Sequence, residues 1–350
     1  MKKNIIVLLI GAALLSACGN EATVTETPVT SSVPEPAETS VAEAEVSSES
    51  GVKEATVSEA EDDEDFGSEF ATMKKDQTID ETVLYEQNDV KITATGISYG
   101  NYSVDLEVVL ENNSDKPLTF LAGTLGYSCN SVNGWMVEDG YMNEEIEPGG
   151  SVETAIGFNS SELLLHGITE IADIQVGFEV EDEDYNRFYT GPLTVETPLA
   201  ASYDYDNDGY RKAINSKALQ YTYDYTIGAF SETEAYNSGG IRILSEGYMT
   251  NTDGDRTLML EVKNDNDFSV YLTTENIKVN DTTIYEDTWS YDSINPGCRA
   301  LTDIRLDNIL DEEEWEEYGI SEIESISLTV TVKNEDGVVI AEPKELTIGV

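Results

Sequence analysis

Five segments of this chain occur twice, in the same order and at a spacing of about 150 residues. Chance similarity between β-patterns explains one such match, but not five in register. The chain therefore contains a duplicated unit, and we expect both copies to adopt the same fold. The matched segments are residues 90–92 with 241–243, 106–110 with 258–262, 147–149 with 295–297, 154–158 with 302–306, and 167–171 with 319–323.

Both copies have the period-two pattern of half-buried β-strands. Val104, Leu106 and Val108 alternate with Asp105 and Glu107, so the apolar side chains fall on one face of a strand. Short strands of this kind, separated by turn residues, are typical of a β-sandwich. We therefore predict an all-β fold of two tandem antiparallel β-sandwiches.

Each copy also contains one short predicted helix before its Gly-Ile motif. In the first copy Ser160 is the expected cap of a helix over residues 162–166, and Gly167 the expected stop. In the second copy residues 311–314 form a capping box, Trp315 faces the core and Gly319 ends the turn.

The first eighteen residues carry a secretory signal. Lys2 and Lys3 precede an apolar run over residues 5–15, and Leu15-Ser16-Ala17-Cys18 follows. This order resembles the lipobox of bacterial lipoproteins. The resemblance implies cleavage before Cys18, lipidation of that cysteine, and a protein anchored by lipid at the extracellular face of the cell membrane.

Composition sets the remaining boundaries. No aromatic residue lies between Gly19 and Glu64, and Ser, Thr, Glu, Ala, Val and Pro dominate there, so this stretch cannot bury enough apolar area to fold. We predict a signal peptide over residues 1–17, a disordered acidic tether over 18–78, a first repeat over 79–198 that folds alone, a Tyr/Asp-rich segment over 199–231, and a second repeat over 232–350.

The turn Asn112 to Pro117, after the strand over residues 106–110, resembles immunoglobulin-like domains of Gram-positive surface lipoproteins. The resemblance covers both repeats and implies two tandem immunoglobulin-like sandwiches, each with one short helix, after a disordered N-terminal stalk. The family is largely uncharacterised and implies no catalytic residues.

The formal net charge is −51, from 70 acidic and 19 basic residues. Such a surface repels nucleic acid and anionic lipid, so we expect neither as a direct partner. His166 is the single histidine; we expect a structural or surface role for it. Glycosidases use a pair of carboxylates in catalysis. Acidic residues are so abundant in this chain that no particular pair indicates such an active site.

Tyr221, Tyr223 and Tyr225 alternate, so on a strand their rings would share one face. Two interpretations stay open. The rings bind a ligand such as a sugar, or they pack against a neighbouring domain as part of an edge strand, which we favour.

Asp204, Asp206 and Asp208 with Gly209 match the start of a calcium loop, but position twelve is Asn215 rather than Glu. We favour a solvated acidic turn; the alternative is a weak calcium site that stiffens the junction between the sandwiches. No other cofactor is expected.

Cys129 and Cys298 do not occupy equivalent repeat positions, and we expect two separate, partly buried thiols. The sequence thus predicts a non-catalytic binding or adhesion protein, with an unknown protein or a wall polymer as ligand. An envelope accessory or sensing lipoprotein is the alternative, and a carboxylate-based hydrolase a more distant one.

Overall fold

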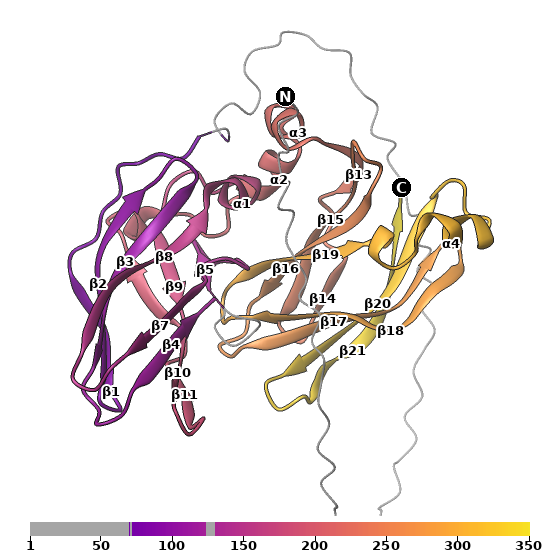
Figure 1. The fold of residues 1–350 in the computed structure, drawn as a ribbon. Coiled ribbons are helices and arrows are strands. Elements are labelled where there is room, and N and C mark those ends of the chain that lie inside the picture. Colours follow the sequence, from indigo (N-terminus) through magenta and orange to yellow (C-terminus); the bar gives the residue numbers. More distant parts are fainter. Residues whose placement is uncertain (1–69, 71, 124–129) are drawn as a thin grey trace, which may run out of the picture. The chain divides into compact units, whose positions relative to one another are not determined.

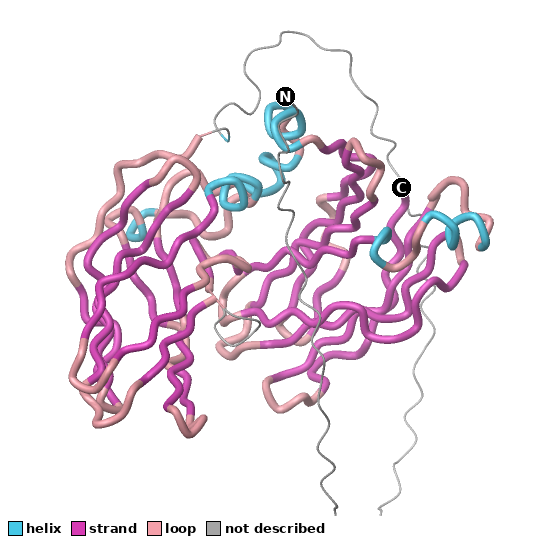
Figure 2. The backbone as a smooth tube through the Cα atoms, viewed as in Figure 1, coloured by secondary structure: helices cyan, strands magenta, loops and turns pink. Residues whose placement is uncertain are grey.

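The computed structural model describes residues 70, 72–123 and 130–350, and Phe70 to Val350 belong to one compact unit. This part of the protein is mostly β, with several antiparallel sheets, so the predicted all-β fold is confirmed (Figures 1 and 2). The predicted signal peptide, Cys18 and most of the predicted tether lie outside the described residues.

The first repeat contains twelve short strands and one helix among its described residues. They are β1 (Thr82–Gln87), β2 (Val90–Tyr99), β3 (Ser103–Asn112), β4 (Leu118–Ala122), β5 (Ser131–Val132), β6 (Trp135–Met136), β7 (Met142–Ile146), β8 (Ser151–Asn159), α1 (Ser160–Leu165), β9 (Asp173–Val176), β10 (Phe178–Asp182), β11 (Arg187–Tyr189) and β12 (Leu193–Glu196).

The segment between the repeats contains three short helices and one strand, and the second repeat returns to strands. The segment holds η2 (Ala200–Ser202), α2 (Gly209–Ile214), α3 (Lys217–Tyr223) and β13 (Tyr225–Ser231). The second repeat holds β14 (Tyr236–Ser238), β15 (Ile241–Asn251), β16 (Arg256–Asn264), β17 (Val270–Val279), β18 (Thr282–Ile294), β19 (Arg299–Arg305), η3 (Leu306–Asn308), α4 (Glu312–Glu317), β20 (Ser325–Asn334) and β21 (Val339–Gly349).

The two repeats have the same strand order. In the first, one sheet runs β1-β2-β3-β8 and the other β11-β10-β4-β7. In the second, β15-β16-β19, with β13 and β14 on the far side of β15, matches the former, and β21-β20-β17-β18 matches the latter. The alternation seen in the sequence is what fills the first core, because Val104, Leu106, Val108 and Leu110 are all buried on one face of β3.

Equivalent asparagines tie equivalent turns to equivalent strands. Asn112 is fully buried and its side-chain amide donates to the Ile146 carbonyl at 2.8 Å. Asn264 is also fully buried and donates to the Ile294 carbonyl at 3.0 Å. Because a buried amide must find partners, the asparagine is a structural requirement of the turn in both copies.

Of the two predicted helix caps, one is confirmed and the other is wrong. Asp311 and Glu314 form the predicted capping box of α4, and Trp315 is buried. The cap of α1 is Asn159 rather than Ser160, since the Asn159 side chain accepts from the Ser161 amide at 2.8 Å. Asn and Ser are nearly equal caps, so local sequence did not decide between them.

One sheet crosses from the first repeat to the second. It runs β12-β9-β5-β6-β19-β16-β15-β13, and the crossing is a parallel contact of Trp135 on β6 with Arg299 on β19. The Arg299 amide donates to the Gly134 carbonyl at 2.7 Å. The strands β5 and β6 lack an equivalent in the second repeat, so the internal repeat gave no indication of this connection.

Candidate functional site

A hollow opens where the end of α1 meets the inter-repeat segment, with a volume of about 310 Å³. Its lining is mostly polar. The lining residues are Gly167, Thr169, Glu170, Leu199, Ser202, Tyr203, Asp204 and Asn207.

Two glycines allow the walls of the hollow to come together. Gly167 ends α1 at a φ of +75°, and the Ile168 amide closes the turn on the Leu163 carbonyl at 2.8 Å. A Cβ on Gly167 would lie 2.2 Å from the backbone carbon of Gly209. Any side chain at position 167 would therefore push the start of α2 away from the end of α1.

The acidic loop over residues 203–208 holds its shape through its own hydrogen bonds. The Asp206 amide donates to the Asp204 carboxylate at 3.0 Å, and the Gly209 amide to the Asn207 side chain at 2.8 Å. The rings of Tyr203 and Tyr205 meet edge to face with centroids 5.0 Å apart. These contacts fix the position of Tyr203, which lines the hollow.

Tyr205 anchors the loop to the first repeat. Its hydroxyl donates to the Asp173 carboxylate at 2.5 Å, and Asp173 is buried. Burial, followed by the hydrogen bond and charge of Asp173, raises the pKa of Tyr205. Tyr205 therefore stays a neutral donor, as the buried carboxylate requires.

A buried ion-pair network anchors the same loop to the second repeat. Arg299 donates to the Asn207 carbonyl at 2.8 Å and to the Glu261 carboxylate at 3.2 Å. Arg211 of α2 lies 3.2 Å from the other oxygen of Glu261, which also accepts from Ser245 at 2.7 Å. Since Glu261 is almost fully buried, its charge depends on these partners.

Two of the three aspartates that match the start of a calcium loop form ion pairs. Asp206 pairs with Lys263 and lies 3.6 Å from Arg299, and Asp208 lies 2.8 Å from Lys212. Hydrogen bonding from these lysines lowers the pKa of Asp206 and of Asp208.

Asp204 contacts its own loop rather than converging with the other two aspartates. Among the described residues, no group of three or more His, Cys, Asp or Glu side chains is placed to hold a metal ion.

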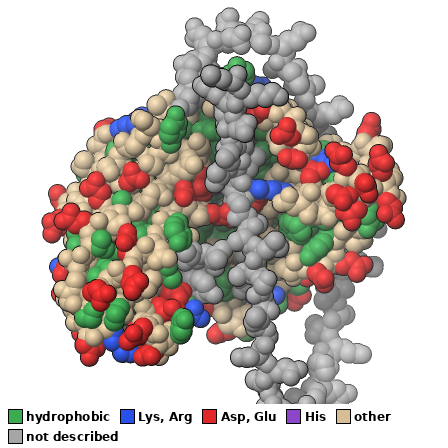
Figure 3. All heavy atoms as spheres, viewed as in Figure 1, with side chains coloured by type: hydrophobic (Ala, Val, Ile, Leu, Met, Phe, Trp, Pro, Cys, Tyr) green, Lys and Arg blue, Asp and Glu red, His purple; other side chains and the backbone are tan. Residues whose placement is uncertain are grey.

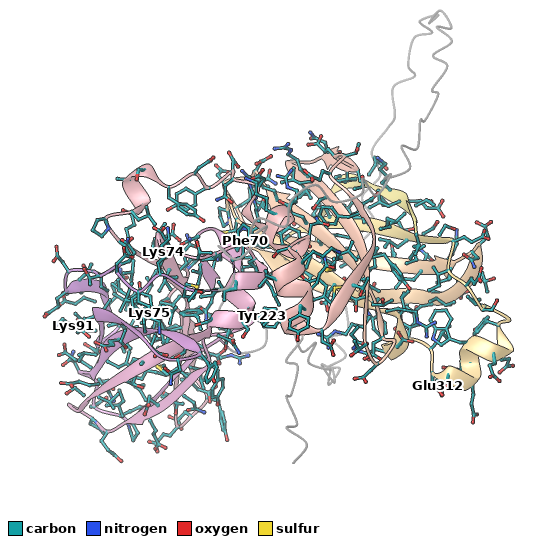
Figure 4. All side chains as sticks on the ribbon, turned by 90° about the horizontal axis from the view of Figure 1, so that it is seen from above. Phe70, Lys74, Lys75, Lys91, Tyr223 and Glu312 are labelled. Atoms are coloured by element: carbon teal, nitrogen blue, oxygen red, sulfur yellow. The ribbon has the colours of Figure 1, made fainter. Side chains whose placement is uncertain are left out.

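The three alternating tyrosines do not lie on one strand, so their expected shared face is wrong. Tyr221 and Tyr223 lie on α3, which begins after a Ser216 cap, and Tyr225 begins β13 after Asp224 adopts a left-handed conformation. Tyr221 is 90% exposed whereas Tyr225 is buried, and Tyr223 marks the end of α3 in Figure 4. Whether these residues contact a ligand stays a prediction, now without the shared face on which it was based.

His166 is a core residue. It caps the end of α1, its ring lies 5.2 Å from that of Trp135, and its Nδ1 is 2.9 Å from the Glu162 carbonyl. Burial lowers the pKa of His166, so the neutral ring is favoured.

Cys298 lies at the junction between the repeats. It is buried, and its Sγ is 3.8 Å from Ser131 Oγ and 3.9 Å from Gln175 Oε1, both in the first repeat. Cys18 and Cys129 lie outside the described residues.

Charge and shape decide which ligands suit the hollow. Glu170 pairs with Lys74, and the other lining residues include a second acidic residue, Asp204, and the hydroxyl-bearing residues Ser202 and Thr169. Figure 3 shows Asp and Glu side chains spread over the visible face, with Lys and Arg at fewer places. Polar ligands that are neutral or cationic therefore fit better than anionic ones.

Sequence reasoning missed Arg299 and Glu261, although one signal was present. In the first repeat the polar Glu107 separates Leu106 from Val108, whereas at the equivalent positions of the second repeat Leu258, Met259 and Leu260 are consecutive apolar residues, followed by Glu261. A strand that is apolar on both faces is covered on both. The acid within it therefore needed a buried partner.

Comparisons with known proteins assign this chain neither a family nor a function. No protein-family model and no curated protein matches the chain. Solved structures give distant matches to β-sandwich proteins. Chicken MD-1 complexed with lipid IVa is 14% identical with a TM-score of 0.17, covering 34% of this chain and 98% of that one.

Two further matches cover more of the chain at similarly low scores. The YadV chaperone is 12% identical with a TM-score of 0.19, covering 69% of this chain and 92% of that one. A conserved domain protein from Bacillus anthracis is 11% identical with a TM-score of 0.23, covering 82% and 93%. Scores this low carry no argument about fold, ligands or partners.

Within the described ranges, no helix combines the length and apolar character needed to cross a membrane.

Proposed function

We propose that this protein is a lipid-anchored binding protein of the extracellular face of the cell membrane, without catalytic activity. The basic start, the apolar run and Leu15-Ser16-Ala17-Cys18 support the anchor. The folded part then consists of two immunoglobulin-like sandwiches, and Cys18 attaches it to the membrane.

The hollow beside α1 is the proposed ligand site, and its lining is the observation that carries the function. Tyr203 lines it together with Ser202, Thr169 and Asp204. An aromatic ring with a few convergent polar groups suits a polar ring-shaped ligand. We assign it to the uncharged sugar units of a wall polymer.

Co-sedimentation with purified, insoluble peptidoglycan tests this assignment. The protein used begins at Gly19, which removes the lipid site and keeps every residue that the structure describes. We expect the wild-type chain to sediment with the polymer, and Tyr203→Ala to lower the bound fraction at least about fivefold, since stacking on one ring contributes on the order of 1 kcal/mol or more.

Tyr185 provides the matched control, because it is 80% exposed and lies in the turn between β10 and β11. Tyr185→Ala removes the same ring elsewhere and is expected to leave sedimentation unchanged. Equal losses in the two variants, or no sedimentation of the wild type, would overturn the assignment to wall polymer.

The anchor has a separate test. Cells grown with a labelled fatty acid are expected to incorporate label into the wild-type protein and not into Cys18→Ser. If Cys18→Ser still incorporates label, the lipid is not attached at Cys18 and the proposed anchor is wrong.

A further inference from the structure

The contact of β6 with β19 places acidic residues of both repeats beside one another. Trp135 and Arg299 pair in parallel, so the residues that follow each run in the same direction. Met136 packs against the second hydrophobic core. Glu138, two residues later, therefore reaches the surface of the second sandwich.

Four carboxyl groups lie near this contact, since the charges of the other three act on Glu138, and we call them the junction carboxyls. Glu138 and Glu162 come from the first repeat, and the Glu138 amide donates to Glu162 Oε1 at 3.2 Å. Asp292 on β18 and Asp303 on β19 come from the second, and the Asp292 carboxylate accepts from Thr302 at 2.7 Å.

One guanidinium among the described residues faces this group, and it neutralises a single member. Arg305 donates to Asp303 at 3.0 Å, while its Nη2 is buried without a hydrogen-bond partner in the described part of the chain. Asp139 lies beside Glu162 and accepts from the Asn159 amide at 2.5 Å. The junction therefore holds more acids than cations.

These surroundings keep protons on the junction carboxyls. Burial, then the charges of Asp303, Glu162 and Asp292, raises the pKa of Glu138 to about 8, against a smaller opposing effect of Arg305. Glu138 is nevertheless an exposed residue, so solvent weakens both the effect of burial and this repulsion.

The other members shift in the same direction. Burial, then the charge of Asp139, raises the pKa of Glu162 to about 7. Burial, followed by the charge of Asp303, raises the pKa of Asp292 to about 6, and burial also raises that of Asp303.

We propose that the junction carboxyls make the contact between the two sandwiches pH-sensitive: tight in mildly acidic surroundings and loosened as the pH rises past neutrality. Protonated carboxyls share the junction without repulsion, whereas ionised ones repel across it. The proposal is independent of what the hollow binds.

The direction follows from proton binding. Groups with raised pKa values hold protons in the folded protein that the unfolded chain has already released. Their contribution to stability is complete below their ordinary values near 4 and is lost as the pH rises through about 6 to 8. Alkaline conditions therefore weaken the junction.

Thermal unfolding and amide exchange of the chain from Gly19 test the proposal. Between pH 5.5 and 8.5 we expect the wild-type midpoint to fall by roughly 5 °C. The Arg299 amide, which bonds to Gly134 across the junction, should lose protection beyond the intrinsic effect of pH. In the double variant Glu138→Gln/Glu162→Gln both changes should shrink to less than half.

Glu183→Gln is the control, because Glu183 is exposed in the turn after β10. The pH dependence of its midpoint and of its Arg299 exchange should equal that of the wild type. This shows that removing one exposed surface charge does not produce the effect. If the double variant follows the wild type in midpoint and in Arg299 exchange, the proposal is wrong.

Discussion

The sheet β1-β2-β3-β8 of the first repeat and its counterpart β15-β16-β19 of the second share strand order but differ on their outer faces. In the first, Val109 is half-buried and Ser151 exposed. At the equivalent positions the second has Glu261 and Arg299, both buried and paired. The duplicated backbone tolerates either arrangement, because the inner face alone builds each sandwich.

The outer face of the second sheet is covered by the segment between the repeats. Tyr210 of α2 is buried, its hydroxyl lies 3.9 Å from Met259 Sδ, and its ring is 5.3 Å from that of Trp135 in the first repeat. Met259 accordingly belongs to the same apolar cluster as the first core. A segment that reads as a linker in sequence is thus a layer shared by both repeats.

The largest expected effect comes from giving the second sheet the residue of the first. Glu261→Val leaves Arg299 and Arg211 without their buried carboxylate and should lower the free energy of unfolding by about 3–5 kcal/mol. Denaturant unfolding measures it. The reverse change, Val109→Glu, places an acid on the open sheet and should cost less than about 1 kcal/mol; similar losses would remove the contrast between the sheets.

The buried asparagine that both repeats share should contribute equally to the stability of each repeat. Asn112→Ala and Asn264→Ala each leave buried backbone carbonyls without a donor, which should cost about 1–3 kcal/mol in either repeat. The comparison of their denaturation midpoints checks this. A large loss from one and none from the other would show that the matching hydrogen bonds do not have matching roles.

The smallest effect is expected at the edge of the covered sheet. Asp206 pairs with Lys263, but its side chain is 72% exposed, so Asp206→Asn should cost at most about 1 kcal/mol. The hydrogen bond and charge of Lys263 lower the pKa of Asp206. The stabilisation is therefore present above the ordinary value near 4 and lost as the pH falls through the lowered one.

Unfolding of wild type and Asp206→Asn over pH 2–7, at low and high salt, measures the contribution of this ion pair. The difference should shrink at the acidic end and in 1 M salt. A stability difference between the two proteins that grows towards low pH would show that the ion pair is not its cause.

The repeats could be predicted because their information is local. Alternation in residues 104–108, the Asn112 and Asn264 turns and the Asp311 cap each depend on a few neighbouring residues. These are the features that the structure repeats in both sandwiches.

The junction and the hollow could not be predicted, because they depend on long-range pairing. Nothing local links Trp135 to Arg299 or Tyr205 to Asp173. The tyrosine alternation at 221–225 misled for the same reason, since period two in a short segment does not exclude a helix when Ser216 supplies a cap.

Scanning calorimetry of the chain from Gly19 at pH 6 tests most directly whether the segment between the repeats makes them one cooperative unit. We predict a single transition with equal calorimetric and van't Hoff enthalpies, because Tyr210, Arg299 and Glu261 bind both repeats into shared packing. Two separate transitions, as expected if residues 79–198 fold as an independent domain, would contradict the account.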